Sequence, residues 1–157
     1  MPHLHEIERK FLVHGVTEDT LAAFPGLDLE QHYLSGCQGV RVRRAGARCI
    51  LTVKGRGSLD RVEVEKDLTE EEYAVLLPLC DRGLAKRRYR VRRWEVDIFR
   101  GTLSGLVLAE IELSQVGEVL PPFPFPDAKI VEVTQDPRFT NSSLAWGAIP
   151  SLEEGRG

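Results

Sequence analysis

Charged side chains of one sign recur two residues apart at several places along this 157-residue chain. The clearest pairs are Glu6 with Glu8, Arg41 with Arg43, Glu63 with Glu65, Lys86 with Arg88, Glu95 with Asp97 and Glu110 with Glu112. Alternate residues of a β-strand point to the same face, so each pair would place two like charges about 7 Å apart on one side of a strand. Like charges so close repel one another. The pattern therefore predicts strands whose charged faces share a ligand of opposite charge.

Alternation with a period of two covers most of the chain and predicts eight strands, at residues 5–13, 39–44, 48–54, 61–68, 85–92, 94–100, 107–113 and 129–134. Short turns containing glycine separate them, which favours an antiparallel barrel or sandwich. Helical signals are few. Thr17 could cap a short helix reaching Phe24, the Thr69–Glu72 capping box predicts a helix followed by an apolar run to Leu79, and Asn141 could cap a last short helix through Trp146.

The signs of the charged pairs indicate what a closed barrel would hold. Paired carboxylates suit hard divalent cations, and paired arginines suit phosphate oxygens. We therefore expect a mainly β (α+β) fold, a closed eight-stranded antiparallel barrel with a charged interior and a few flanking helices. The alternative is an amphipathic sheet whose charged face is in water, as in a domain that interacts through its surface.

Composition excludes several other classes. The net charge of −3 argues against a nucleic-acid-binding protein, and every apolar stretch is too short to cross a bilayer. The first ten residues lack an apolar export segment, and the three cysteines form no CxxC pair, so we expect a cytoplasmic protein with reduced thiols. The proline-rich stretch 121–126 predicts an exposed, extended loop rather than a boundary, which leaves residues 1–157 as one domain.

The charged pairs also belong to an ordered set of motifs that resembles the CYTH superfamily, the triphosphate tunnel metalloenzymes. The set begins with the ExExK signature of Glu6, Glu8 and Lys10. It continues with RVR at 41–43, TVK at 52–54, EVE at 63–65, Lys86 with Arg88, EVD at 95–97, EIE at 110–112, and Asp136, Arg138 and Asn141 near the end. The resemblance spans roughly residues 5–146, nearly the whole chain.

The resemblance implies a tunnel that binds a linear triphosphate with Mg²⁺ or Mn²⁺, and it assigns roles by position. The metal would be held by Glu6, Glu8, Glu110 and Glu112. Phosphate would be bound by Lys10, Arg41, Arg43, Lys54, Arg61, Arg88 and Arg138. Catalytic roles fall to Lys86, Glu63, Glu65 and Tyr33, with Glu95 and Asp97 as supporting acids. Residues 143–157 would form a lid helix and tail at one tunnel end.

The function implied is metal-dependent hydrolysis of the terminal phosphoanhydride of inorganic triphosphate. The same family offers thiamine triphosphatases and class IV-type adenylate cyclases as alternatives, and a non-catalytic module that binds polyphosphate or nucleotide is an alternative of another class. No GxSxG or Walker-type motif suggests a covalent nucleophile or a P-loop. We expect a small polyanion as partner, no nucleic acid or membrane, and a monomer or homodimer.

Overall fold

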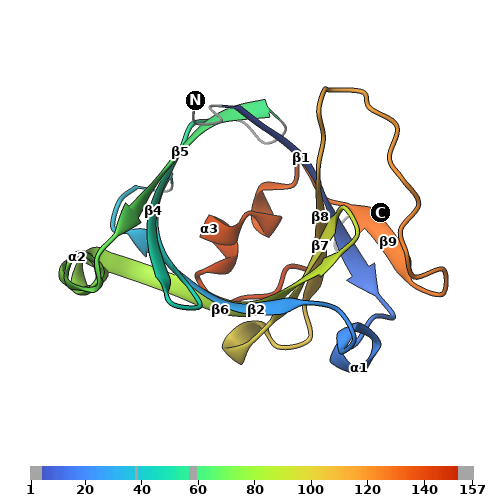
Figure 1. The fold of residues 1–157 in the computed structure, drawn as a ribbon, viewed down its shortest axis with the longest axis horizontal. Coiled ribbons are helices and arrows are strands. Elements are labelled where there is room, and N and C mark those ends of the chain that lie inside the picture. Colours follow the sequence, from blue (N-terminus) through green and yellow to red (C-terminus); the bar gives the residue numbers. More distant parts are fainter. Residues whose placement is uncertain (1–4, 38, 57–59, 152–157) are drawn as a thin grey trace.

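Eight antiparallel strands close into a barrel in the computed structural model, which describes residues 5–37, 39–56 and 60–151. In chain order the strands are β1 (His5–His14), β2 (Gly26–Leu34), β3 (Val40–Ala45), β4 (Arg48–Lys54), β5 (Asp60–Leu68), β6 (Cys80–Val91), β7 (Trp94–Phe99), β8 (Val107–Glu112) and β9 (Lys129–Glu132). The order around the barrel is β5-β4-β3-β2-β6-β7-β8-β1, and a further pairing between β1 and β5 closes the ring (Figure 1). The predicted closed barrel is confirmed.

The prediction was wrong for one of the eight expected barrel strands. The strand expected at 129–134 is β9, which lies outside the barrel on the edge of β1, paired with Phe11–His14. Its place in the ring is taken by β2, which the alternation did not predict. The inward residues of β2 are Leu29, Gln31 and Tyr33, so the strand carries no pair of like charges to reveal it.

The outward face of the barrel buries most of the apolar side chains. Trp94, Val96 and Ile111 belong to the largest cluster, which lies under the long segment between β8 and β9. Phe123 of that segment meets Trp94 edge to face, with ring centroids 5.1 Å apart. The stretch at 121–126 is therefore extended, as predicted, but it is not simply exposed, because Phe123 and Phe125 pack against the barrel wall.

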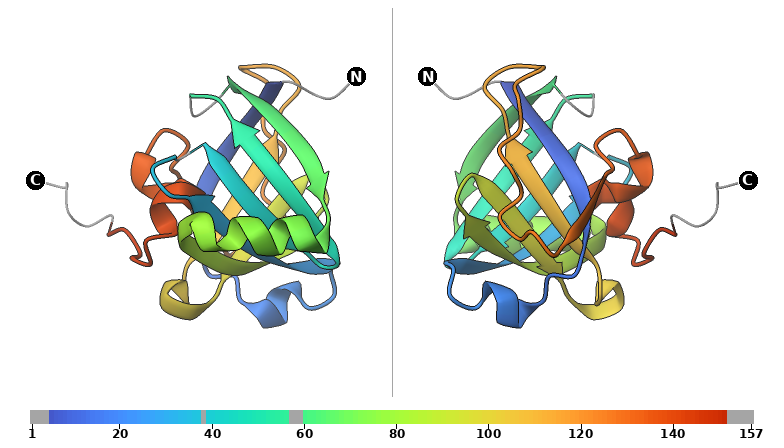
Figure 2. Two further views of the ribbon diagram at one scale, coloured as in Figure 1. Left: turned by 90° about the vertical axis from the view of Figure 1, so that its left-hand side faces the viewer. Right: turned by 90° about the vertical axis from the view of Figure 1, so that its right-hand side faces the viewer.

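Two helices cover other parts of the outer surface. The helix α2 (Glu70–Leu76), continued by the 3₁₀ turn Leu77–Leu79, runs across β3 and β4, and its Tyr73 packs on Val42 and Cys49 (Figure 2). Its capping box is formed as predicted: Thr69 Oγ1 accepts a hydrogen bond from Glu72 N at 3.0 Å, and Thr69 N donates to Glu72 Oε1 at 2.9 Å. The helix α1 (Glu18–Leu21) begins after Thr17 but ends before Phe24.

The short helix α3 (Asn141–Leu144) lies at one end of the barrel: it falls within the ring in the view along the barrel (Figure 1) and stands at the mouth of the barrel in the side views (Figure 2). Its cap is Thr140, not Asn141 as predicted: Thr140 Oγ1 accepts from Ser143 N at 3.1 Å. The helix ends at Leu144, and Leu144 and Phe139 pack on Leu12, Leu84 and Leu108 of the barrel interior. Part of the expected tail, residues 152–157, lies outside the described residues.

None of the described helices is long and apolar enough to cross a membrane.

Candidate functional site

The inward faces of the strands line a cavity of about 610 Å³ inside the barrel. We call it the acid-rich chamber, because seven carboxylates face four cations there. Its lining residues are Glu6, Glu8, Glu63, Glu65, Glu95, Glu110, Glu112, Arg41, Arg43, Lys54, Arg88, Gln31 and Asn141. All four residues assigned to the metal by resemblance are in this set. The expectation that the charged pairs face inward is therefore met around this chamber.

A second cavity, of about 710 Å³, lies on the side of α3. It shares Glu8, Arg41, Lys54 and Asn141 with the first and adds Lys10, Tyr33, Arg56 and Arg61 among its charged and aromatic lining. Here five cations face the single carboxylate of Glu8. We call it the base-rich chamber. The tunnel interior therefore changes from predominantly acidic to predominantly basic toward the end that α3 occupies.

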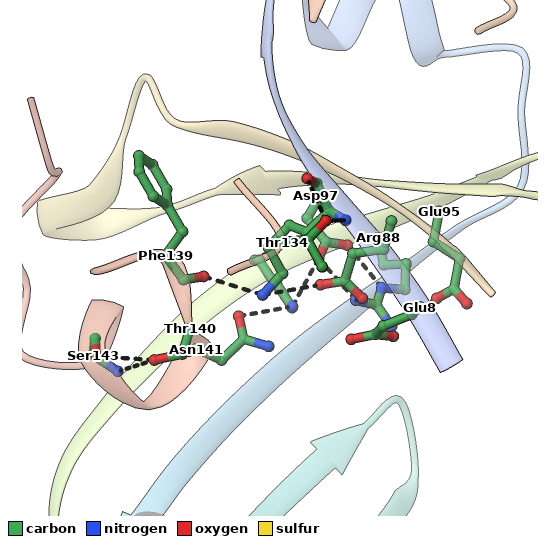
Figure 3. Close-up of polar contacts among 12 residues, drawn as sticks. Glu8, Arg88, Glu95, Asp97, Thr134, Phe139, Thr140, Asn141 and Ser143 are labelled. Carbon is green, nitrogen blue, oxygen red and sulfur yellow. Dashed lines mark hydrogen bonds and ion pairs between the residues drawn. The ribbon is translucent and has the colours of Figure 1, made fainter. Parts of the chain in front are cut away.

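The wall formed by β6, β7 and β8 carries a continuous set of ion pairs, which we call the ion-paired wall. Arg88 Nε and Lys86 Nζ each approach an oxygen of Asp97 at 2.7 Å. Arg88 also reaches Glu95 at 2.6 Å and Glu110 at 3.4 Å. Figure 3 shows Asp97, Glu95 and Glu8 gathered around the Arg88 side chain. The guanidinium of Arg88 is therefore held by three carboxylates, those of Asp97, Glu95 and Glu110.

Burial sets the protonation of this wall. The Lys86 and Asp97 side chains are both 0% exposed, and neither lines a chamber. Burial lowers the pKa of Lys86 to about 8, although Asp97 opposes the shift. Burial also disfavours the charged form of Asp97, but Arg88 and Lys86 outweigh it and hold the pKa of this carboxyl below its usual value. The pair is therefore charged near neutral pH, with Asn141 Oδ1 as a further acceptor 3.4 Å from Lys86 Nζ.

The carboxylates expected to bind metal crowd one another. Burial, followed by repulsion from Glu110 and Glu6, raises the pKa of Glu8 to about 7. Burial and the neighbouring Glu63 raise the pKa of Glu6. Burial opposes ionisation of Glu110 as well, but Lys10 and Arg88 outweigh it and hold its pKa well below the usual range. The β1 carboxylates thus lie in an excess of negative charge.

This donor set fits a hard divalent cation, because carboxylate oxygens are the ligands that Mg²⁺ and Mn²⁺ prefer. In the part of the chain that the structure describes, no three His, Cys, Asp or Glu side chains already converge on one point. Instead the carboxylates contact cations of the protein: Glu8 with Arg61 at 2.9 Å, Glu6 with Lys54 at 3.6 Å, and Glu110 with Lys10 at 3.6 Å. A metal ion held by Glu6, Glu8 and Glu110 would share these carboxylates with Arg61, Lys54 and Lys10.

The opposite situation holds on β2 and β3. Three inward side chains there, Gln31, Arg41 and Arg43, form what we call the donor wall. Gln31 Nε2, Arg41 Nε and Arg43 Nε are all buried without a hydrogen-bond partner among the described residues. The strand register places Gln31 beside Arg43. Burial, together with repulsion from Arg41, lowers the pKa of both Arg43 and Lys54. Arg43 Nη2 does reach Glu65 Oε1 at 3.7 Å, but the three buried nitrogens have no acceptor of their own among the described residues and are available to an anion.

Two other residues assigned by resemblance differ in their placement. Tyr33 is 3% exposed and lines the base-rich chamber, where burial raises its pKa and Arg41 opposes the shift. Arg138 lies in the 3₁₀ turn Pro137–Phe139, pairs with Asp136 at 2.8 Å and lines neither chamber. The phosphate-binding role that the resemblance gives Arg138 therefore stays a prediction.

Gln31 and Asn141 line the site without having been assigned a role from the sequence. Gln31 could have been found from Tyr33, because it lies two residues earlier on the same strand face. Asn141 stands in the motif set, but its contact with Lys86 joins residues 55 positions apart, a distance that no local pattern reveals.

Comparisons with known proteins agree with this geometry. A protein named inorganic triphosphatase from Acetivibrio thermocellus is 37% identical, over 95% of this chain and 98% of its own length. Another of that name, from Nitrosomonas europaea, is 36% identical over 89% of this chain and 96% of its own. A crystal structure described as an inorganic triphosphatase superposes with a TM-score of 0.61 and 29% identity, covering 93% of this chain and 97% of that one. Residues 4–119 match the CYTH domain family. The chain therefore belongs to the CYTH domain family.

Proposed function

We propose that this chain hydrolyses inorganic triphosphate: water attacks a terminal phosphorus atom, the bond from that phosphorus to the bridging oxygen breaks, and orthophosphate forms as pyrophosphate leaves. The observation that carries the proposal is the donor wall. Its Gln31 Nε2, Arg41 Nε and Arg43 Nε atoms are buried without a partner among the described residues, and the same cavity is lined by carboxylates. A buried donor without a partner is costly, and an anion with many oxygens would satisfy several at once. The names of the two relatives support the same substrate.

Binding of the triphosphate is proposed to rest on Arg41, Arg43 and Lys54, which line the acid-rich chamber. Lys10 and Arg61 extend the positive surface into the base-rich chamber. Arg88 faces the substrate from the other side, with its direction set by Asp97 and Glu95. Phosphoryl transfer depends chiefly on positioning and on neutralising charge, which this arrangement supplies.

Family membership implies a divalent metal ion, and we propose Mg²⁺ or Mn²⁺ held by Glu6, Glu8, Glu110 and Glu112. When bound, such an ion neutralises phosphate charge and makes water a better nucleophile. Glu63 lies beside Glu6 and is 15% exposed, and we propose that it and Glu65 take up the proton of the attacking water. Lys86 acts through the Arg88–Asp97 pair to stabilise the charge of the transferred group, and Tyr33 donates a hydrogen bond from its phenol O–H to a phosphate oxygen.

We also propose that residues 1–157 act as one unit in the cytoplasm, as a monomer or homodimer without nucleic-acid or membrane partners. The free thiols of Cys37, Cys49 and Cys80 support a reducing compartment.

The test is orthophosphate release from tripolyphosphate, ATP and thiamine triphosphate, each with Mg²⁺, with Mn²⁺ and with EDTA. We expect release to be fastest from tripolyphosphate and abolished by EDTA. Glu110→Gln should lose most of this activity, whereas Glu71→Gln, the same change on the exposed face of α2, should keep it. Fast release from thiamine triphosphate alone, or cyclic AMP formed from ATP, would assign a different reaction. Binding of tripolyphosphate without turnover would indicate a non-catalytic module.

A further inference from the structure

The β2 strand carries an amide, Gln31, to which the proposed reaction assigns no specific contact with the substrate. Gln31 is only 1% exposed, lines the acid-rich chamber, and its Nε2 atom has no hydrogen-bond partner among the described residues. An amide left in this condition destabilises the folded protein, since water would otherwise satisfy it. The stability of the fold therefore does not explain why an amide occupies this position.

The neighbours of Gln31 on β6 and along β2 are apolar, so an apolar side chain could stand here without the cost of burying an unpartnered amide. Its partner across the β2–β6 pairing is Leu84, and the preceding inward residue of its own strand, Leu29, is 4% exposed. An unbranched apolar side chain of similar length, such as methionine, would fill the same space without burying a polar group. The packing of this part of the barrel therefore does not call for an amide.

The other side of Gln31 does offer a use for a donor. Its partner across the β2–β3 pairing is Arg43, whose Nε is also buried without a partner, as is that of Arg41. A third cation here would add to the repulsion that already lowers the pKa of Arg43. A neutral amide adds a hydrogen-bond donor at the same place without adding charge.

We propose that Gln31 is a further substrate-binding residue, whose Nε2 donates a hydrogen bond to a phosphoryl oxygen of the triphosphate beside Arg43. The inference rests on the proposed function, because it takes inorganic triphosphate as the ligand. This role separates stability from affinity, two properties that would fall together if Gln31 were structural. Removing the amide leaves the empty protein as stable as before, or more stable, and weakens the binding of the triphosphate.

The experiment compares wild type, Gln31→Met and a matched control, Gln115→Met, which makes the same change at an exposed position. The ligand is imidotriphosphate, an analogue with nitrogen bridges that resists hydrolysis, added with Mg²⁺. Calorimetric titration measures its affinity, and thermal melting is recorded with and without it. Steady-state hydrolysis of tripolyphosphate gives KM and kcat separately.

We expect Gln31→Met to melt at or above the wild-type temperature when empty, and to bind imidotriphosphate at least about tenfold more weakly. KM for tripolyphosphate should rise by a similar factor, and Gln115→Met should match wild type throughout. An unchanged affinity of Gln31→Met for imidotriphosphate would overturn this inference and leave the proposed function intact. So would an empty variant that melts several degrees lower or does not fold, because the amide would then be structural.

Gln31→Glu, which keeps the shape and replaces the donor with a negative charge, should bind imidotriphosphate more weakly still. Wild type that neither binds nor hydrolyses triphosphate would overturn the proposed function, and the inference with it.

Discussion

The ion-paired wall and the donor wall of the same barrel treat their buried polar groups in opposite ways. On β6, β7 and β8, Asp97 is bound by both Lys86 and Arg88 at 2.7 Å, so each charge has a partner within the protein. On β2 and β3, Gln31 and Arg41 keep buried donors without any partner among the described residues. The charges of one wall are paired within the folded protein, and we propose that the donors of the other wall are completed by the ligand.

The difference indicates which wall carries stability and which carries recognition. A buried ion pair is costly to form, but removing one partner is worse, because it leaves an isolated buried charge. Removing a donor that has no partner leaves no buried group without the partner it had before. A ligand that satisfies the donor wall binds only the folded state, and therefore stabilises it in proportion to its affinity. Substitutions on the two walls should thus separate folding from binding.

The largest effect is expected on the ion-paired wall. Asp97→Asn keeps the shape of the side chain but leaves Lys86, which is 0% exposed, without its carboxylate. We expect the free energy of unfolding to fall by about 3–5 kcal/mol, measured by urea denaturation. Asp67→Asn, which breaks the exposed pair with Arg48, is the control and should unfold close to wild type. An Asp97→Asn protein as stable as wild type would show that this wall does not support the fold.

The next effect concerns Glu8, which faces the ion-paired wall from β1. Its pKa of about 7 in the folded protein exceeds the ordinary value of 4.5, so the folded state holds the proton more tightly than the unfolded state. The empty protein should therefore lose stability as pH rises from about 4.5 to 7, by at most ~3 kcal/mol from this group. Glu8→Gln should flatten the dependence in urea denaturation at pH 5 and pH 7.5. Equal slopes for the variant, wild type and a Glu71→Gln control would contradict the crowding of these carboxylates.

A third, smaller effect tests the donor wall. Arg41 is 6% exposed, and its charge lowers the pKa of Arg43 and Lys54. Arg41→Met relieves that repulsion, so the empty protein should unfold at the same urea concentration as wild type or a higher one. Affinity for imidotriphosphate should fall by about 1.5–3 kcal/mol, the worth of a charge-assisted hydrogen bond. Loss of stability without loss of affinity would reverse the roles of the two walls.

The smallest effect is expected outside the tunnel. Arg138 pairs with Asp136 and donates to the Ser151 carbonyl oxygen at 2.8 Å, away from both chambers. Arg138→Gln should change the affinity for imidotriphosphate by less than about twofold in the same titration. A tenfold loss would instead support the phosphate contact that the family resemblance implies, and would extend the binding surface beyond the donor wall.

The sequence predicted the barrel and most of its inward charges because like-charged pairs on β1, β3, β5, β6, β7 and β8 are local patterns. It missed β2 because Leu29, Gln31 and Tyr33 carry no repeated charge. It also counted β9 as a barrel strand, since alternation does not reveal which edge a strand joins. Which charged side chains pair with each other could not be predicted from the sequence. Arg61 meets Glu8 across 53 residues and Lys10 meets the Phe139 carbonyl across 129, contacts that only the closed barrel creates.

A crystal structure of the protein with imidotriphosphate and Mg²⁺ would show whether the donor wall receives the triphosphate. We predict phosphate oxygens within hydrogen-bond distance of Arg41 Nε and Arg43 Nε, with the pairs of Asp97 to Lys86 and Arg88 kept as they are in the empty protein. An anion bound elsewhere on the surface, with the donor wall still unsatisfied, would contradict the claim that this wall is built to receive triphosphate.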